Sequence, residues 1–386
     1  MITIQEVKTK KQIKEFIEFP LKLYKGSPYF VPPLYMEERN MFKPNFAYND
    51  QCEHVFFNAY RDGKMVGRIS GILQHASNEK WKQKRVRFTR FDSINDIEVA
   101  KALFGAVQDW ARAKGMTEIV GPLGYSDLER EGLLIEGFDQ LSTFEEQYNY
   151  DYYPKLIESL GFVKEVDWIE SKLTLPAQEN ERLRRMSELV MRRYKLHLDH
   201  SKNTRQFLKN YADDFFEIMD ITYNDIYGTV PMTERMKKMM ISNFKLMVDP
   251  RFVSVILDEN DKVVCFGLCL PSISKAVQKS GGRLTLPAIF KLLKSIKHPH
   301  ILDLALIGVL PEYAKKGVSS VLLYEMTNIL RREKIAYAET NLNLENNLNV
   351  RNMWKNFDTV EHKRRRCYVK PIENINNLKL SNFKTT

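Results

Sequence analysis

Cysteine is scarce in this chain of 386 residues, and its few copies follow no familiar pattern. The four cysteines are Cys52, Cys265, Cys269 and Cys367. They form no Cys-x-x-Cys pair, which argues against the usual zinc and thiol-redox motifs. Cys265 and Cys269 lie inside an apolar, strand-like run. We therefore expect buried free thiols, with no disulfide framework and no bound metal.

Long apolar runs are also missing from the sequence. None approaches the roughly 18 residues that a membrane-spanning helix requires. The first residues, Met1 to Lys14, are polar and mixed in charge, unlike a secretory signal. Together with the free thiols, these absences predict a cytoplasmic protein without a transmembrane segment. Peripheral contact with a membrane surface stays open.

What the chain does have is length and positive charge. Its 386 residues exceed the size at which one hydrophobic core usually suffices, which favours two domains. The formal net charge of +10 favours an anionic partner, such as a phosphorylated cofactor, a nucleic acid or an anionic membrane. Since the sequence lacks interleaved aromatic and basic motifs, we expect no nucleic-acid partner.

The two halves of the sequence share one order of expected elements: strand, helix, hairpin, strand, helix, strand, helix, strand. Each hairpin has a turn signal, at Asp62-Gly63 in the first half and at residues 259–261 in the second. Such an order indicates an internal duplication. We predict a first domain over residues 1–176, a linking helix over 177–199 and a second domain over 200–386. The predicted fold class is α/β, with an α+β mixed sheet.

Residues 301–332 carry the clearest functional signal. A nearly unbroken apolar run over 301–309 predicts a buried strand, and apolar spacing from Val318 onward predicts an amphipathic helix. The turn between them holds Lys315, Lys316 and Gly317. A turn that leads into a helix offers unpaired N–H groups and a positive dipole end, so it suits a phosphate. The alternative is an ordinary strand-turn-helix unit with solvated lysines.

Residues 309–323 resemble the acyl-CoA pyrophosphate loop of the GNAT (Gcn5-related N-acetyltransferase) superfamily. The family pattern is Arg/Gln-x-x-Gly-x-Gly/Ala; here Ala314 stands first, Gly317 is retained and Ser319 stands last. The resemblance extends over nearly the whole chain and implies two GNAT-like acyl-CoA N-acyltransferase domains in tandem. It implies acetyl-CoA or a longer acyl-CoA as co-substrate, and a set of residues that bind it. They are Val309, Leu310, Ala314, Lys315, Lys316, Gly317, Val318, Ser319 and Ser320.

The corresponding place in the first copy, residues 91–98, lacks these features. It has no glycine, and its three acids would repel a pyrophosphate. We therefore assign acyl-CoA to the second copy and regard the first as a degenerate partner that supplies structure or substrate contacts.

GNAT enzymes let an amine attack a thioester, so they need a base and often use a tyrosine as acid. The family's second motif, Asn-x-x-Ala-x-x-x-Tyr, aligns with Asn347 to Trp354, which puts Trp354 at the tyrosine position. Tyr324 could serve instead, catalysis could proceed without an acid, or the copy could only bind. The candidate base is Glu339, and the predicted catalytic residues are Glu339, Tyr324 and Asn347.

A long acidic and tyrosine-rich connection, residues 121–153, predicts the substrate contacts. A connection of this length is usually functional or disordered, and its aromatic content argues against disorder. It would attract a cationic amine, and its acids are further candidate bases if it folds over the cleft. The predicted substrate-binding residues are Tyr125, Asp127, Glu129, Glu131, Tyr148 and Tyr152.

Three first-copy segments, residues 19–34, 121–138 and 148–162, look like a group of bacterial tandem GNAT-like N-acyltransferases. Some relatives of that group are associated with acylation of long-chain amines in sphingolipid synthesis. The histidines show no triad or ligand spacing, and the basic run of residues 363–366 is interpreted as a solvated sheet edge.

The leading hypothesis is an acyl-CoA-dependent N-acyltransferase that acts on a small-molecule amine, with acyl-CoA bound by the second copy. The alternative is a non-catalytic GNAT-like module that binds acyl-CoA or a partner. The acceptor amine, the acyl length, the role of the first copy and the oligomeric state stay open.

Overall fold

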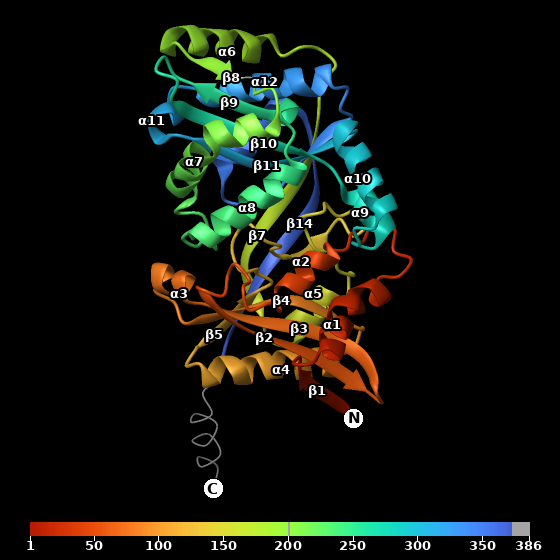
Figure 1. The fold of residues 1–386 in the computed structure, drawn as a ribbon. Coiled ribbons are helices and arrows are strands. Elements are labelled where there is room, and N and C mark those ends of the chain that lie inside the picture. The colour runs from red at the N-terminus through yellow and green to blue at the C-terminus, as the bar shows by residue number, and fades with distance from the viewer. Residues whose placement is uncertain (200, 373–386) are drawn as a thin grey trace.

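One twisted sheet runs through the whole molecule and joins its two halves (Figure 1). The structure is a computed structural model, and it describes residues 1–199 and 201–372. Residues 200 and 373–386, which belong to the second predicted domain, lie outside the described residues. The strand order is β1-β2-β3-β4-β5-β14-β7-β12-β11-β10-β9-β8, while β6 pairs with β14 and β13 pairs with β7.

The strands are β1 (Ile2–Glu6), β2 (Cys52–Arg61), β3 (Lys64–Gln74), β4 (Arg85–Ser93), β5 (Glu118–Gly121), β6 (Leu133–Glu136), β7 (Val163–Thr174), β8 (His197–Asp199), β9 (Val253–Leu257), β10 (Val263–Pro271), β11 (Ile301–Val309), β12 (Tyr337–Thr340), β13 (Asn343–Leu344) and β14 (Asp358–Pro371). The helices are α1 (Lys10–Leu23), α2 (Tyr35–Asn40), α3 (His75–Trp81), α4 (Ile97–Ala113), α5 (Tyr153–Ser159), α6 (Glu181–Tyr194), α7 (Thr204–Tyr223), α8 (Glu234–Met247), α9 (Ser274–Ser280), α10 (Leu286–Lys297), α11 (Pro311–Ala314), α12 (Val318–Arg332) and α13 (Leu348–Met353). Two short 3₁₀ turns are η1 (Pro250–Phe252) and η2 (Trp354–Asn356).

Both predicted hairpins are confirmed. The β2–β3 pair closes through Asp62 and Gly63, whose φ angles of 50° and 75° suit a two-residue type I′ turn. The β9–β10 pair closes through residues 258–262. The four cysteines are buried and unpaired, as expected. Within the described ranges, no helix is long and apolar enough to cross a membrane.

In each half, two parallel strands start side by side and then separate. In the first half β4 pairs with β5 over residues 85–87, and in the second half β11 pairs with β12 over residues 301–304. Beyond these residues β4 and β11 are no longer paired with a described strand on that side. Each half therefore contains a V-shaped opening in the sheet.

The last strand, β14, crosses from the second half into the first. It pairs with β7 from Asp358 opposite Thr174 to Val369 opposite Val163, and its end pairs with β5. The strand β7 in turn reaches β12, where Leu173 lies opposite Ala338. The central ribbon of β7 and β14 therefore belongs to both halves.

This position corrects the interpretation of residues 363–366 as a solvated edge. Lys363 is 2% exposed and Arg365 is fully buried. The prediction fails for these two side chains because β14 is an interior strand, flanked by β5 or β6 on one side and by β7 on the other.

A small apolar cluster packs the first half against the second. Val31 and Phe144 contact Ile273 and Val277. Backbone bonds reinforce this contact, since the Tyr35 N–H donates to the Gly282 carbonyl at 2.9 Å. The long connection after β5 therefore lies against the second half.

Candidate active site

The turn before α12 is open to an anion. Gly317 adopts a left-handed φ of 79° as N-cap, a conformation that glycine takes without strain, and no side chain caps the helix. Among the described residues, the N–H groups of Gly317, Val318 and Ser319 have no hydrogen-bond acceptor. Lys315 is exposed beside them. These groups create a positive site that fits a phosphate.

Two neighbours border the turn. Lys316 points its Nζ over the ring of Tyr313, 4.1 Å from the centroid, and lies 5.3 Å from the ring centroid of Tyr194 in α6. Ser320 donates from its hydroxyl to the Gly317 carbonyl at 2.7 Å. Lys316 and Ser320 therefore shape the turn, while Lys315 and the free N–H groups remain available.

The corresponding helix in the first half, α4, is already capped. The Asp96 carboxylate accepts from the N–H groups of Glu98 at 2.9 Å and Val99 at 3.3 Å. Arg61 pairs with the same carboxylate at 2.7 Å. A built-in anion thus occupies the helix N-terminus, and a phosphate would be repelled by it.

The two V-shaped openings are bordered by similar hydrogen bonds. In the first half, the Phe88 carbonyl accepts from Leu123 N–H at 2.9 Å, and Ser93 N–H donates to the Tyr153 hydroxyl at 2.9 Å. Both hydrogen bonds use backbone groups of β4. In the second half, Ala305, Leu306 and Ile307 of β11 are only partly buried. The Leu304 carbonyl of β11 likewise accepts from the Asn341 N–H at 3.2 Å, so backbone groups along the edge of each opening are already hydrogen-bonded.

Tyr223, at the end of α7, contacts the free edge of β11. Its hydroxyl donates to the Ile307 carbonyl at 3.1 Å and accepts from the Ile307 N–H at 3.2 Å. Both backbone groups point away from β10, because the N–H and C=O of one strand residue face the same edge. Burial and, to a smaller extent, Asp127 raise the pKa of Tyr223 to about 12, although the hydrogen bond with Ile307 lowers it. Asp127, predicted to bind substrate, thus lies near this edge.

Two buried carboxylates stand side by side where β11 and β12 still pair. Asp303 lies directly opposite Glu339. Their strand neighbours Leu302, Leu304 and Ala338 share an apolar cluster with α12. Since side chains alternate along a strand, both carboxylates face the opposite side of the sheet, which is the side of α7.

The surroundings shift the pKa values of the two carboxylates in opposite directions. Burial, the neighbouring Glu339 and the more remote Glu145 raise the pKa of Asp303 well above its usual range. Burial also raises the pKa of Glu339, but Lys363 and His362 outweigh it, so that this pKa lies below its ordinary value. Asp303 Oδ1 has no hydrogen-bond partner among the described residues. These surroundings therefore favour the protonated form of Asp303 and the ionised form of Glu339.

A chain of alternating charges continues from Glu339 into the centre of the sheet. Lys363 Nζ lies 2.5 Å from Glu339 and 2.6 Å from Glu170, and Arg365 lies 2.6 Å from Glu170. Burial raises the pKa of Glu170, but Arg365 and Lys363 lower it to about 2 overall. Arg365 also donates to the carbonyl of Gln147, so the connection after β5 covers this side of the sheet.

The other predicted catalytic residues lie apart from this carboxylate pair. Tyr324 is on α12, on the far side of the sheet, and donates to Glu179 at 3.1 Å. Asn347 caps α13, where its side chain accepts from the Val350 N–H at 3.3 Å. Trp354 is 3% exposed and donates to Asn343 at 2.7 Å. These three side chains have structural contacts, and only Glu339 of the predicted trio joins the pair.

Of the six predicted substrate residues, Tyr125, Glu131 and Tyr148 are buried and the other three are half-buried. The Tyr125 hydroxyl bonds His54 at 3.2 Å, that of Tyr148 donates to the Phe138 carbonyl at 3.1 Å, and that of Tyr152 donates to the Ser93 carbonyl at 2.7 Å. Glu129 accepts from the Tyr125 N–H at 3.3 Å. These four residues hold the first half together.

Glu131 and Asp127 face the second half. A side chain added at Gly228 would meet Glu131 Oε1 at 3.2 Å, and Asp127 accepts a backbone hydrogen bond from Val230. The structure therefore does not gather the six predicted residues in one place.

Sequence reasoning missed Asp303 and Tyr223. A signal existed for Asp303, because it is the one acid in the apolar run of residues 301–309. Tyr223 offers no such signal, since only the packing of α7 brings it to β11.

No family model matches the sequence. Protein YghO of Escherichia coli (strain K12) is 29% identical over 379 residues, which cover 94% of each chain. A protein named Bacterial ceramide synthase, from Caulobacter vibrioides (strain NA1000 / CB15N), is 29% identical over 304 residues, covering 77% of each chain.

Solved structures resemble the fold at low sequence identity. A tandem GNAT protein from the clavulanic acid biosynthesis pathway has a TM-score of 0.55 at 10% identity, covering 97% of this chain and 99% of its own. A GCN5-related glucosamine N-acetyltransferase region of a fungal β-N-acetylglucosaminidase has a TM-score of 0.59 at 9% identity, covering 96% of this chain and 38% of that one. The chain thus has the tandem GNAT fold, which confirms the resemblance that its motifs predict.

Proposed function

We propose that the protein is an acyl-CoA-dependent N-acyltransferase whose second copy holds the acyl-CoA. One contrast supports this assignment. The second copy has an uncapped helix N-terminus, whereas the Asp96 carboxylate caps the equivalent helix in the first copy.

The binding residues follow from this contrast. The N–H groups of Gly317, Val318 and Ser319, with Lys315, would hold the pyrophosphate through charge-assisted hydrogen bonds. The N–H and C=O of Ile307 would bond the amide-bearing arm once the Tyr223 hydroxyl releases them. Val309 and Leu310 lie between these two sites and would line the path.

The carboxylate pair would receive the amine. An approaching ammonium favours the ionised form of Asp303, because an opposite charge nearby lowers the pKa of a carboxylic acid. The ionised pair can then accept the proton that the amine must lose before it attacks. Asp303 and Ile307 are four residues apart on one strand, roughly 13 Å, so this transfer would use intervening water.

Tyr223 would act as the acid when the thiolate leaves. The bound thioester supplies the acyl group, and its carbon–sulfur bond breaks as the new carbon–nitrogen bond forms. Tyr223, placed at Ile307, would give its proton to the departing sulfur, and the proton taken from the amine would restore the hydroxyl through solvent.

A binding experiment tests the loop assignment. Gly317→Asp places a negative charge against the phosphates and should weaken acetyl-CoA binding at least tenfold in calorimetric titration. Gly317→Asn has a similar shape without the charge and should weaken it less. Gly26→Asp, at another left-handed glycine with open space around it, should leave the affinity unchanged. Equal affinity in all four proteins would show that the loop is misassigned.

A second candidate function is a non-catalytic acyl-CoA-binding module. Two observations favour it: Trp354 replaces the family's tyrosine and is packed in the core, and Tyr223 occupies the edge of β11. A thiol-release assay separates the two functions. Because one relative is named a ceramide synthase, the panel should include long-chain amines and long-chain acyl-CoAs beside small ones. Binding without thiol release across the panel would favour the module.

A further inference from the structure

Helix α10 exposes a row of large apolar side chains. Leu286 is 75% exposed, Phe290 74%, Leu293 53% and Ile289 38%, and Leu284 just before the helix is 38% exposed. Positions 286, 290 and 293 lie on one face of the helix, because residues three and four apart are neighbours. Ala288 is the one buried residue of the helix.

The opposite side of α10 is fixed to the protein. Leu292 and Ile296 pack on the cluster of Val31, Phe144, Ile273 and Val277. Arg251 binds the carbonyl groups at the end of the helix, at 3.5 Å for Ile296 and 3.1 Å for Lys297.

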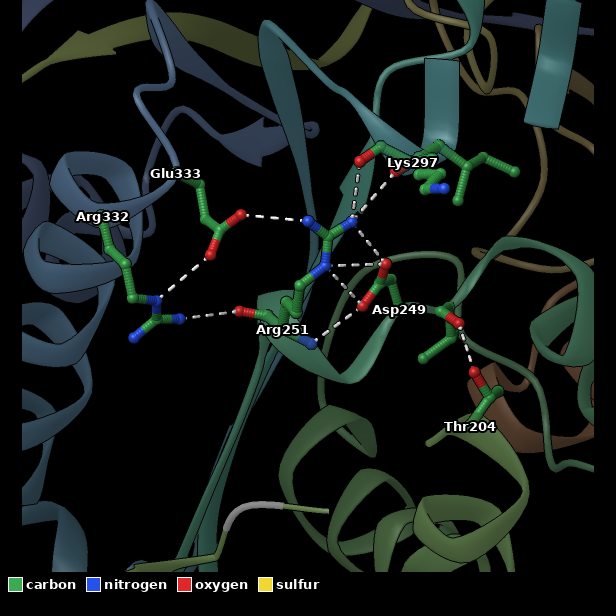
Figure 2. Close-up of polar contacts among 8 residues, drawn as sticks. Thr204, Asp249, Arg251, Lys297, Arg332 and Glu333 are labelled. Carbon is green, nitrogen blue, oxygen red and sulfur yellow. Dashed lines mark hydrogen bonds and ion pairs between the residues drawn. The ribbon is translucent and has the colours of Figure 1, made fainter. Parts of the chain in front are cut away.

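The same guanidinium pairs with Asp249 at 2.7 Å and with Glu333 at 3.0 Å, which ties α10 to the end of α12 (Figure 2). These anchors prevent α10 from turning its apolar row inward. The row therefore remains a permanent feature of the surface.

Positive charge accompanies the apolar row. Lys291, Lys294 and Lys297 are exposed on α10, and the helix contains no acid. None of the three forms an ion pair within the described part of the chain. The helix runs along the outside of the second half, beside α9 (Figure 1).

We propose that α10 is a docking surface for an anionic lipid bilayer. An interfacial helix places leucine and phenylalanine at the boundary between headgroups and acyl chains, and its lysines meet the anionic headgroups. The row on α10 has this composition, and the net charge of +10 adds long-range attraction to an anionic surface. An apolar groove on a partner protein would not require three lysines that form no ion pair with the described residues.

Docking through α10 would also place the candidate active site beside the membrane. Phe144 packs in the cluster under α10, and Glu146, two residues further, lies 3.9 Å from Arg365 in the charged chain of the sheet. This consequence rests on the proposed function, whereas the docking itself does not. A long-chain amine or acyl group in the bilayer would then be close to the site.

The test is co-sedimentation of the full chain with vesicles of phosphatidylcholine, alone or mixed with phosphatidylglycerol. We expect binding to the mixed vesicles and little to phosphatidylcholine alone. The double variant Leu286→Ser/Phe290→Ser should lower the partition coefficient at least tenfold. The matched control Leu246→Ser/Val360→Ser changes side chains that are 68% and 61% exposed elsewhere and should leave it unchanged.

The same co-sedimentation assay tests the contribution of the lysines on α10. Lys291→Gln/Lys294→Gln should lower partitioning about fivefold for each lysine at low salt and less at high salt. Lys10→Gln/Lys11→Gln, on α1, is the control. Absence of binding to mixed vesicles, or equal binding by all variants, would overturn the proposal. So would a concentration-dependent dimer in sedimentation velocity that Phe290→Ser abolishes, because a second copy would then be the occupant.

Discussion

Asp303 is the residue whose position says most about the proposed chemistry. It is buried beside Glu339, lies on the same strand as Ile307 and has one oxygen without a hydrogen-bond partner in the described ranges. A carboxylate that costs this much to bury is usually kept for a function. Asp303 therefore joins Glu339 as a candidate base, although the sequence drew attention to Glu339 and to the acids of residues 121–153.

Replacing Asp303 by asparagine should separate stability from activity. Because the folded pKa of Asp303 is raised, the folded chain binds more protons than the unfolded one above the ordinary aspartate pKa, so stability falls as pH rises. Asp303→Asn should remove this slope from thermal unfolding and lower thiol release by about 10²-fold or more. Asp109→Asn, a change on the surface, should do neither. Unchanged turnover would exclude Asp303 as the base.

Tyr223 leads to a second prediction at this scale. Tyr223→Phe removes the hydroxyl from the edge of β11 and should cost about 1 kcal/mol of unfolding free energy. Acetyl-CoA should bind at least as tightly, since Ile307 becomes free, while kcat should fall about 10²-fold or more if Tyr223 is the acid. Calorimetry and the thiol assay measure the two effects. A loss of stability with normal kcat would assign Tyr223 a structural role only.

At the scale of elements, the ribbon of β7 and β14 depends on buried charge. Glu170 lies between Lys363 and Arg365, and the side chains of all three are inaccessible to solvent. Breaking a buried pair leaves an uncompensated charge, whereas a surface pair contributes little. The ribbon should therefore respond to changes in its charges more strongly than the exposed helices do.

Glu170→Gln should destabilise the protein by about 3–5 kcal/mol in denaturant titration. The matched change Glu361→Gln, on the neighbouring strand β14 and in an exposed pair with Arg351 of α13, should cost less than about 1 kcal/mol. If both variants lose a similar free energy of unfolding, the buried charges do not stabilise the ribbon more than an exposed pair does.

The contribution of Glu170 to the free energy of unfolding should decrease at low pH. The pKa of Glu170 is depressed to about 2, so its contribution is complete above the ordinary glutamate pKa of about 4.3. It is lost as pH falls from there through about 2, because the unfolded chain takes up the proton first. The wild-type protein should lose stability in this window more steeply than Glu170→Gln, as followed by circular dichroism.

At the scale of the molecule, the two halves share strands and should unfold together. Because β14 pairs with β5 and β7, neither half can complete its sheet alone. Calorimetry should show one transition, with equal calorimetric and van't Hoff enthalpies. Residues 1–176 expressed alone should fail to fold and should be rescued by co-expression with residues 177–386. Two separate transitions would contradict the shared ribbon.

The sequence determined the local features of this protein. Turn residues specified both hairpins, apolar periodicity specified β11 and α12, and Gly317 marked the loop between them, because each depends on residues close together in the chain. The family resemblance, and with it the tandem GNAT fold, followed from those local motifs.

The tertiary structure decided what depends on distant pairing. Arg365 lies opposite Trp168 in the ribbon, and Tyr223 meets Ile307, yet no local pattern encodes either contact. Burial of Lys363 and Arg365, the facing of Asp303 and Glu339, and the exposure of α10 all follow from how the strands and helices assemble. Local propensity acts over a few residues, whereas these contacts join segments that only the folded sheet brings together.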